Sequence, residues 1–352
     1  MTYSAFDHPI LSGLVGDPEI AAFFSVDADL KAMLAFEAAL ATAQARHGLI
    51  PMDAAEQIAT LCATFRPNVD ALRQSVAADG VLVPELVRQI RKAVGDAAIH
   101  VHFGATSQDV IDTSLMLRLK AACGLVRARL SSIINTMTAL ETEHGTAELT
   151  GYTRMQTAIP ITVADRVHSW RAPLERHKAR LAALDETAFA VQFGGAAGTL
   201  EKFASKGPTL RSALAAELGL ATQPQWQSQR DGIAEIAGLF SLITGSLGKF
   251  GQDVALMAEL GGEIALSGGG ASSAMPHKQN PVAAEVLVSL ARFNAVQLSG
   301  MHQALVHEQE RSGAAWTLEW LILPQMAGAL AASLRIGISL SGNITRLGKT
   351  GG

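Results

Sequence analysis

Three short polar segments interrupt an otherwise apolar sequence, and the first has the side chains of an anion-binding site. It covers residues 102–109 and places Thr106, Ser107 and Gln108 where a long apolar pattern begins. Hydroxyl and carboxamide groups beside the free backbone N–H groups of a helix start suit an anionic ligand group. The alternative is that Thr106, Ser107 or Asp109 only caps the helix.

The second segment, residues 151–160, precedes another long apolar pattern. Thr153, Arg154 and Gln156 are polar among apolar neighbours. The alternative interpretation is a polar loop that leads into a helix starting after Pro160.

The third segment, residues 267–281, carries the strongest chemical signal. Three consecutive glycines allow a loop to open and close, with Ser272 and Ser273 at its tip. Lys278 and Asn280 follow, where the next helix would start, so they could hold a carboxylate or lower the pKa of a serine hydroxyl. A mere flexible connection does not need Met, Pro, Lys and Asn in this order, so we predict a functional loop.

The sequence shows no pattern that is typical of other common kinds of active site. There is no phosphate-binding glycine loop, no dinucleotide fingerprint and no GxSxG nucleophile turn. The stretch from His307 to Arg311 lacks the second histidine of a zinc-binding helix. Cys62 and Cys123 supply neither a disulfide framework nor a metal-ligand set. We therefore expect proton-transfer chemistry with no metal and no cofactor.

Five long apolar patterns at helical spacing predict the elements that position these segments. They cover residues 108–143, from 160 onwards, 231–261, 280–311 and 316–341. A helix of about 30 residues is about 45 Å long, and such helices bury their stripes only by lying side by side. We therefore predict an all-α, elongated multi-helix bundle, in which Pro324 kinks or breaks the fifth helix. Bundles of this kind also favour a homo-oligomer.

The composition agrees with close-packed helices. Of the 352 residues, 49% are hydrophobic, 17% are charged and 5% are aromatic, which excludes a disordered chain. Shorter patterns broken by prolines predict a smaller N-terminal helical domain at 1–104. The central long-helix bundle would cover 105–342, and 343–352 would be a short polar tail.

The net charge and the N-terminal sequence limit the kinds of partner that the protein can have. A formal net charge of −4 argues against a nucleic-acid-binding protein, which needs a basic face. The N-terminus lacks the basic and apolar regions of a signal peptide. The apolar stretch at 316–338 contains charged and proline residues, so it favours a buried helix over a membrane span. We expect a cytoplasmic protein without membrane or nucleic-acid partners.

The three segments together resemble the signatures of the fumarase/aspartase superfamily. ASSAMPHKQNP at 271–281 resembles the superfamily loop GSSxMPxKxNP, and the other two segments occur in the right order and spacing. HFGATSQDVIDT at 102–113, GGAAGTL at 194–200 and ERSGAAWTLEW at 310–320 are most similar to the branch of lactone-forming muconate cycloisomerases. The short chain also fits that branch, because the related lyases usually carry a further C-terminal helical domain.

The resemblance implies a fold, an assembly and a reaction. The fold would be the all-α bundle of the fumarase/aspartase type, assembled as a homotetramer whose sites combine segments of three subunits. The substrate would be a small polyanionic carboxylate, a 3-substituted muconate with a carboxylate or a sulfonate at position 3. One carboxylate would add to a double bond, and an acid would protonate the carbon α to another carboxylate.

The resemblance also implies a role for each matching residue. Ser272 would transfer the proton, and the other residues would bind substrate or support the loop. The substrate-binding set comprises Thr106, Ser107, Gln108, Thr153, Arg154, Gln156, Lys278, Asn280 and Arg311. The supporting set comprises Ser273, Met275, His277 and Glu285.

One position departs from the superfamily pattern. Many members have a histidine, oriented by a glutamate, where this chain has Arg154; Glu285 matches that glutamate. Arginine stays protonated, so Arg154 is better suited to clamp an anion than to shuttle a proton. Two alternatives remain open: a fumarate-releasing lyase of the adenylosuccinate or argininosuccinate type, and a structural tetramer without catalysis.

Overall fold

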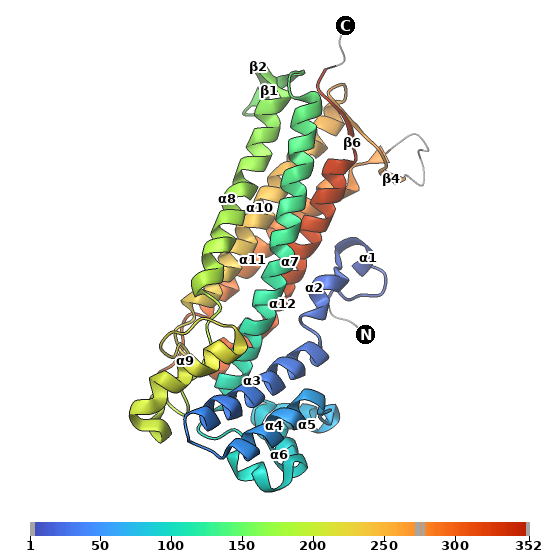
Figure 1. Cartoon of the computed structure of the whole chain (residues 1–352). Helices are drawn as coiled ribbons and strands as arrows, with labels where there is room; N and C mark the ends of the chain where they lie inside the picture. Colours follow the sequence, from blue (N-terminus) through green and yellow to red (C-terminus); the bar gives the residue numbers. More distant parts are fainter. Residues whose placement is uncertain (1–3, 272–274, 276–278, 350–352) are drawn as a thin grey trace.

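Long helices dominate the computed structural model, which describes residues 4–271, 275 and 279–349 (Figure 1). Five of them form an elongated bundle, as the apolar patterns predict: α7 (Ser107–His144), α8 (Val163–Thr187), α10 (Asp231–Leu260), α11 (Val282–Gln303) and α12 (Gly313–Gly342). Helix α10 packs against α8, α11 and α12, while α7 packs against α8 and α12. The all-α prediction is confirmed.

Two details of the helix predictions differ from the structure. Helix α11 ends at Gln303 and does not reach residue 311. Pro324 lies inside α12 without ending it, so the predicted break is wrong. The buried helix predicted at 316–338 is confirmed as part of α12.

Small residues let the central helices approach closely. A Cβ added at Gly248 of α10 would lie 2.5 Å from the Cβ of Ala291, and one at Gly251 would lie 2.6 Å from the carbonyl oxygen of Ala284. Both contacts are far shorter than side chains allow, so α10 and α11 touch almost backbone to backbone. The alanine-rich, aromatic-poor composition is used for this close packing.

Shorter helices precede the bundle. They are α1 (Ser12–Val15), α2 (Pro18–Ala22), α3 (Val26–Arg46), α4 (Met52–Thr64), α5 (Val69–Asp79), α6 (Val83–Val94) and the 3₁₀ helix η1 (Gly95–His100). Helices α1 and α2 lie beside α12, and the others cover one end of the bundle (Figure 1). Helix α3 packs along α7 near its start (Figure 1). The 3₁₀ helix η2 (Glu201–Lys206) and α9 (Gly207–Leu218) join α8 to α10, and α9 packs on α3. A domain boundary at residue 104 stays a prediction.

Short strands, which the sequence did not predict, close the other end of the bundle (Figure 1). The pairs are β1 (Glu148–Thr153) with β2 (Gln156–Thr162), β3 (Ile264–Leu266) with β6 (Ile344–Leu347), and β4 (Gly270–Ala271) with β5 (Gln279–Asn280). Strand β6 lies in the segment predicted as a polar tail. Ile344 and Leu347 are buried there, so this segment closes the bundle instead of leaving it.

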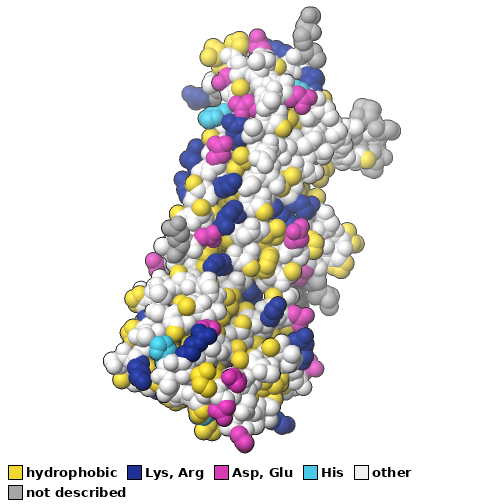
Figure 2. Space-filling model, viewed as in Figure 1, with side chains coloured by type: hydrophobic (Ala, Val, Ile, Leu, Met, Phe, Trp, Pro, Cys, Tyr) yellow, Lys and Arg dark blue, Asp and Glu magenta, His cyan; other side chains and the backbone are white. Residues whose placement is uncertain are grey.

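Three helices, α10, α11 and α12, are long and apolar enough to cross a membrane by length and composition alone. Helices α10 and α12 bury 61% and 67% of their most apolar window inside the bundle, so these residues form the core. Helix α11 buries only 28% of its window. The face in Figure 2 mixes basic, acidic and apolar side chains along the bundle and shows no concentrated basic patch.

Candidate active site

The first polar segment forms a capped helix start beside the N-terminal helices. Thr106 is the N-cap residue of α7, and its backbone N–H donates to Oδ2 of Asp109 at 3.0 Å. The capping interpretation is therefore confirmed for this pair. Thr106 and Ser107 are half-buried at the first turn, where the N-terminal end of the helix dipole favours an anion.

Asp109 joins this helix start to the glycine-rich segment at 194–200. Its buried carboxylate accepts hydrogen bonds from the backbone N–H groups of Gly194 at 2.9 Å and Gly195 at 3.0 Å, and from Nε2 of Gln192 at 3.2 Å. Burial raises the pKa of Asp109 from 3.8 to about 6, although these N–H donors oppose the shift. The stabilising contribution of Asp109 is therefore largest at acid pH and is lost as the pH rises through about 6.

Gln108 and Arg311, both expected to bind substrate, contact each other within one chain. The side chain of Gln108 is fully buried, and its Oε1 accepts a hydrogen bond from Nε of Arg311 at 2.9 Å. Its Nε2 donates to Oδ2 of Asp112 at 3.0 Å and to the carbonyl oxygen of Gln227 at 2.7 Å. Direct substrate binding by Gln108 stays a prediction, but protein groups already occupy both ends of its amide.

The second polar segment is a β-hairpin, so the alternative interpretation as a polar loop is wrong. Thr153 on β1 pairs with Gln156 on β2, and the two turn residues, Arg154 and Met155, have φ angles of 49° and 64°. Such positive angles at both turn positions match the twist of a two-residue hairpin. Pro160 lies inside β2, and α8 starts beyond it. Thr153, Arg154 and Gln156 are all exposed at the end of the bundle.

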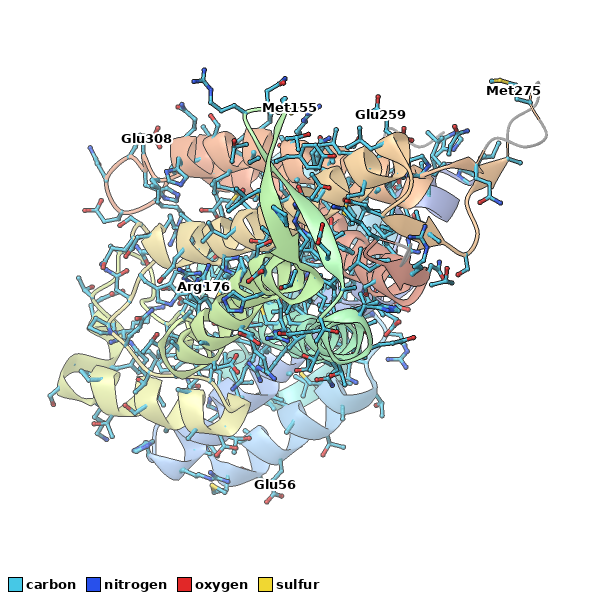
Figure 3. The ribbon with its side chains drawn as sticks, turned by 90° about the horizontal axis from the view of Figure 1, so that it is seen from above. Glu56, Met155, Arg176, Glu259, Met275 and Glu308 are labelled. Atoms are coloured by element: carbon cyan, nitrogen blue, oxygen red, sulfur yellow. The ribbon has the colours of Figure 1, made fainter. Side chains whose placement is uncertain are left out.

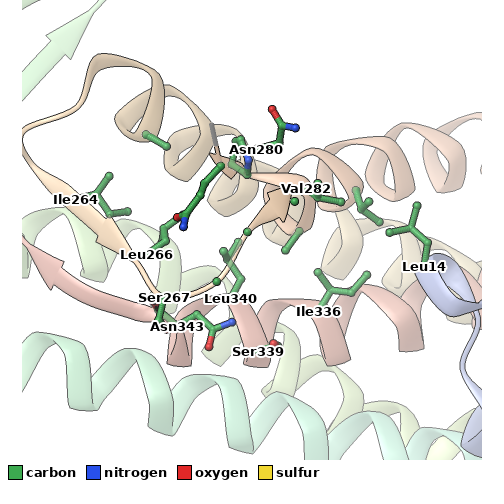
Figure 4. Close-up of a pocket in the computed structure, with 18 of the residues that line it drawn as sticks. Leu14, Ile264, Leu266, Ser267, Asn280, Val282, Ile336, Ser339, Leu340 and Asn343 are labelled. Atoms are coloured by element: carbon green, nitrogen blue, oxygen red, sulfur yellow. Dashed lines mark hydrogen bonds between the residues drawn. The ribbon is translucent and has the colours of Figure 1, made fainter. Parts of the chain in front are cut away.

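The base of the third segment lines a cavity of about 530 Å³ (Figure 4). Asn280 lies on β5 opposite Gly270 of β4 and contributes to this cavity. Its other walls are mainly apolar and come from α12 and β3, with Leu340 and Leu266 among them. Asn280 is half-buried, as expected for a residue at the edge of a binding site.

Several predicted residues of this loop lie outside the described part of the chain. They are Ser272, Ser273, His277 and Lys278. Met275 is described, and 42% of it is exposed. Figure 3 shows Met275 and Met155, from the hairpin tip, projecting from separate sides of the bundle.

The expected pairing of Arg154 with Glu285 does not occur within one chain. Glu285 lies in the first turn of α11 and is exposed, as is Arg154. In the described ranges 4–271, 275 and 279–349, neither residue takes part in an ion pair.

The predicted site residues fall at two ends of the molecule. Thr106 and Gln108 lie at the start of α7, and the hairpin with Thr153 follows its end (Figure 1). With 38 residues, α7 spans about 57 Å at about 1.5 Å per residue. Asn280 lies at the same end as the hairpin, because Oε1 of Glu263, just before β3, accepts the N–H of Thr150 at 2.9 Å. One chain therefore holds Arg311 near the first segment and keeps both far from the other two.

Sequence reasoning missed a buried ion cluster beside the first segment. Arg230 binds Asp112 and Glu319, and all three side chains are at most 2% exposed. Asp112 lies within the quoted motif at 102–113 and Glu319 within the quoted motif at 310–320, whereas Arg230 has no local pattern that marks it. The charge of Glu319 among apolar neighbours is a further signal that could have singled it out.

The described residues offer no evident metal site. Within 4–271, 275 and 279–349, no group of three or more His, Cys, Asp or Glu side chains is placed to hold a metal ion. Cys62 and Cys123 are buried free thiols, as expected, and burial raises the pKa of each to about 12. Neither thiol is available as a nucleophile near neutral pH.

The long-helix bundle and its polar segments define an enzyme of the fumarase/aspartase superfamily, and the chain belongs to this family. A sequence model of the lyase family, described as "Lyase", matches residues 15–296.

Within this family, the chain is similar to particular enzymes of known name. The chain is 38% identical over 328 residues to a 3-carboxy-cis,cis-muconate cycloisomerase of Pseudomonas aeruginosa, covering 91% of this chain and 72% of that enzyme. The crystal structure of the 3-carboxy-cis,cis-muconate lactonizing enzyme of Pseudomonas putida aligns with a TM-score of 0.90 and 35% identity, covering 96% of this chain and 77% of that one. A fumarate lyase of a Mesorhizobium species aligns with a TM-score of 0.88 and 32% identity, covering 94% and 76%.

The lengths of these relatives correct one argument from the sequence. The short chain seemed to favour a cycloisomerase over a lyase. The matched cycloisomerases are themselves longer than this chain, which covers 72% to 78% of three of them. Chain length therefore does not separate the two reactions.

Proposed function

We propose that the protein is a cycloisomerase that converts 3-carboxy-cis,cis-muconate to 4-carboxymuconolactone. The observation that carries this proposal is the 38% identity to a 3-carboxy-cis,cis-muconate cycloisomerase over 91% of the chain. Three anion-binding segments, brought together from different subunits, would suit a substrate with three carboxylates. A 3-sulfomuconate, with a sulfonate at position 3, fits the same arrangement of charges.

The reaction is an internal addition that needs one acid. A carboxylate oxygen of the substrate forms a bond to one carbon of a double bond, and the π electrons move toward a second carboxylate. The resulting aci-carboxylate collects negative charge, and a proton is then added to the carbon α to it. Atoms balance without an external nucleophile, oxidant or reductant, so the protein supplies orientation, charge stabilisation and a proton.

We assign the proton to Ser272 and the stabilisation of the aci-carboxylate to Lys278 and Asn280. A free serine hydroxyl is too weak an acid at neutral pH, so nearby cations must lower its pKa. The position of Asn280 beside the 530 Å³ cavity supports its role in binding. Ser273, Met275 and His277 would support this loop.

A second carboxylate of the substrate would bind at the start of α7. Thr106 and Ser107 are half-buried there beside a helix N-terminus, and Arg311 adds a positive charge. Thr153 and Gln156 would line the same cavity from another subunit. Arg154 would clamp the third anionic group, held by Glu285 of a neighbouring chain.

We further propose that the active protein is a homotetramer with sites shared between subunits. The distance of about 57 Å along α7 prevents one chain from bringing the first and third segments together. Helix α11 leaves most of its apolar window unburied in one chain, and Val296 is 73% exposed. A second copy packed on this helix would cover that surface. We place the enzyme in the cytoplasm, with 1–104 and 105–342 as its two domains.

A fumarate-releasing lyase is the second candidate. Its support is the structural match to a fumarate lyase, with a TM-score of 0.88. Both reactions pass through an aci-carboxylate, so the same proton-transfer and anion-binding residues could serve either. A tetramer without catalysis has no comparable support, since the serine and lysine of the loop are both retained.

Product analysis in D₂O tests the proposed reaction. The cycloisomerase should add one deuterium to the carbon α to a carboxylate, so the lactone carries one non-exchangeable deuterium in its NMR spectrum. The control is the Ser272→Ala variant under the same conditions, which should form almost no lactone. Release of fumarate from a succinyl adduct, with no lactone from muconate, would favour the lyase instead.

A further inference from the structure

A buried ion cluster lies directly behind the start of α7. The guanidinium of Arg230 binds Oδ2 of Asp112 through Nη1 at 2.6 Å and Oε1 of Glu319 through Nε at 2.8 Å. Its Nη2 contacts the second oxygen of each carboxylate at 3.1 and 2.5 Å. The cluster joins α7, the residue before α10, and α12, so it ties three elements together at this end of the bundle.

Stability alone does not account for such a cluster. Replacing buried ion groups with apolar side chains of similar size is often neutral or stabilising, because desolvation offsets the attraction. Here two carboxylates share one guanidinium, and burial raises the pKa of Glu319 against the opposing effect of Arg230. An arrangement of this kind suggests a geometric role, so its contacts outside the cluster matter.

Only one of the two carboxylates reaches the candidate active site. Oδ2 of Asp112 accepts a hydrogen bond from Nε2 of Gln108 at 3.0 Å, and Oδ1 accepts one from Nε1 of Trp316 at 3.1 Å. The same Nε2 also donates to the carbonyl oxygen of Gln227 at 2.7 Å. Two acceptors therefore fix the amide nitrogen of Gln108 on the inner side.

This orientation leaves the amide oxygen of Gln108 facing Arg311. Nε of Arg311 donates to that oxygen at 2.9 Å, and Nη2 donates to the carbonyl oxygen of Ala196 at 3.2 Å. A rotated amide would place its NH₂ group against a guanidinium, donor against donor. Within the part of the chain that the structure describes, Nη1 of Arg311 has no hydrogen-bond partner and remains available for an anion.

We infer that Asp112 is a positioning residue that orients Arg311 through the amide of Gln108. Arg230 and Trp316 hold the Asp112 carboxylate, which fixes the amide, and the amide oxygen fixes the guanidinium that binds a substrate carboxylate. This inference rests on the proposed function, which makes Arg311 an anion-binding residue. It also gives the buried Gln108 a role that does not require contact with substrate.

The test compares two carboxylates that bind the same guanidinium. Asp112→Asn removes the charged acceptor of Gln108, and we expect KM for 3-carboxymuconate to rise about tenfold, as for loss of one hydrogen bond to a charged group. The value of kcat should change little. Glu319→Gln is the matched control, because Glu319 is equally buried but does not contact Gln108. It should lower Tm and leave KM unchanged.

A double-mutant cycle separates positioning from general destabilisation. In the Arg311→Met background, adding Asp112→Asn should raise KM no further, because the residue it orients is gone. If Asp112→Asn folds poorly, Gln108→Met replaces it in the test. This substitution removes the amide between Asp112 and Arg311 and leaves the ion cluster intact, so it should raise KM in the same way. Equal KM values for Asp112→Asn and Glu319→Gln, or additive effects with Arg311→Met, would overturn the inference.

Failure of the proposed function gives a different result. If the wild-type protein releases fumarate and forms no lactone, the cycloisomerase proposal fails. The same variants are then measured with the fumarate-releasing substrate, and the cycle still reports on Asp112. With either substrate, the positioning role is contradicted if Asp112→Asn raises KM by the same factor in the wild-type and Arg311→Met backgrounds.

Discussion

Mixing two inactive variants should restore activity if the sites are shared between chains. Ser272→Ala changes the residue that follows β4, a strand at one end of the bundle, and Arg311→Met removes the proposed anion-binding group at the other end. The two ends are about 57 Å apart along α7, so one chain cannot supply both to a single site. In a mixed oligomer, some sites draw an intact Ser272 from one variant and an intact Arg311 from the other.

The expected activity of the mixed oligomers follows from the fraction of sites that receive both intact segments. The two variants are present in equal amounts and assemble at random. Half of the sites then receive an intact Ser272, and half of those also receive an intact Arg311, so about a quarter of the sites are complete. The variants are co-expressed with different affinity tags, and mixed oligomers are purified through both tags. Lactone formation is then measured at a substrate concentration below KM, where each variant alone has little activity.

Two controls make the result decisive. Each variant is also co-expressed with itself under both tags, which gives the background activity. Recovery of roughly a quarter of the wild-type rate supports sites shared between subunits. Activity equal to that background, in oligomers shown to contain both chains, would refute the geometric reasoning.

Three further predictions concern single residues. Ser272→Ala should lose most turnover while keeping the wild-type Tm and oligomer size; near-normal kcat would remove Ser272 from the proton-transfer role. Arg154→Met should raise KM strongly, since the proposed anion clamp is lost, and an unchanged KM in steady-state kinetics would show that Arg154 does not bind the substrate anion. Asp109→Asn removes a carboxyl whose pKa is raised to about 6, so the wild-type protein should lose stability relative to this variant as the pH rises from about 3 to about 7. The expected loss is about 3 kcal/mol, at about 1.4 kcal/mol per pKa unit, in urea unfolding at a series of pH values. A difference in unfolding free energy that is constant across this range would contradict the raised pKa.

The long helices could be predicted from the sequence because their apolar stripes are periodic. Leu119, Val126 and Met137 lie on one face of the α7 pattern, and all three are fully or almost fully buried. The strands could not be predicted in this way, since each is short, and β3 and β6 pair across about 80 residues of sequence. Ile344 and Leu347 looked like part of a polar tail until β6 was found paired with β3.

The site was predictable in its residue types and less so in its arrangement. Motif resemblance located Gln108 and Arg311, and the structure joins them directly. The spacing did not reveal that Gln108 is buried, because its partners Gln227 and Arg311 come from separate parts of the chain. Contacts between distant charged residues leave no periodic trace in the sequence.

Ultraviolet spectroscopy with three substrates tests the central claim most directly. The purified protein is mixed separately with 3-carboxymuconate, adenylosuccinate and argininosuccinate. A cycloisomerase removes the conjugated double bonds of muconate, so absorbance should fall with 3-carboxymuconate while neither of the other two substrates yields fumarate. Fumarate release from either succinyl compound, with no change in the muconate absorbance, would contradict the account.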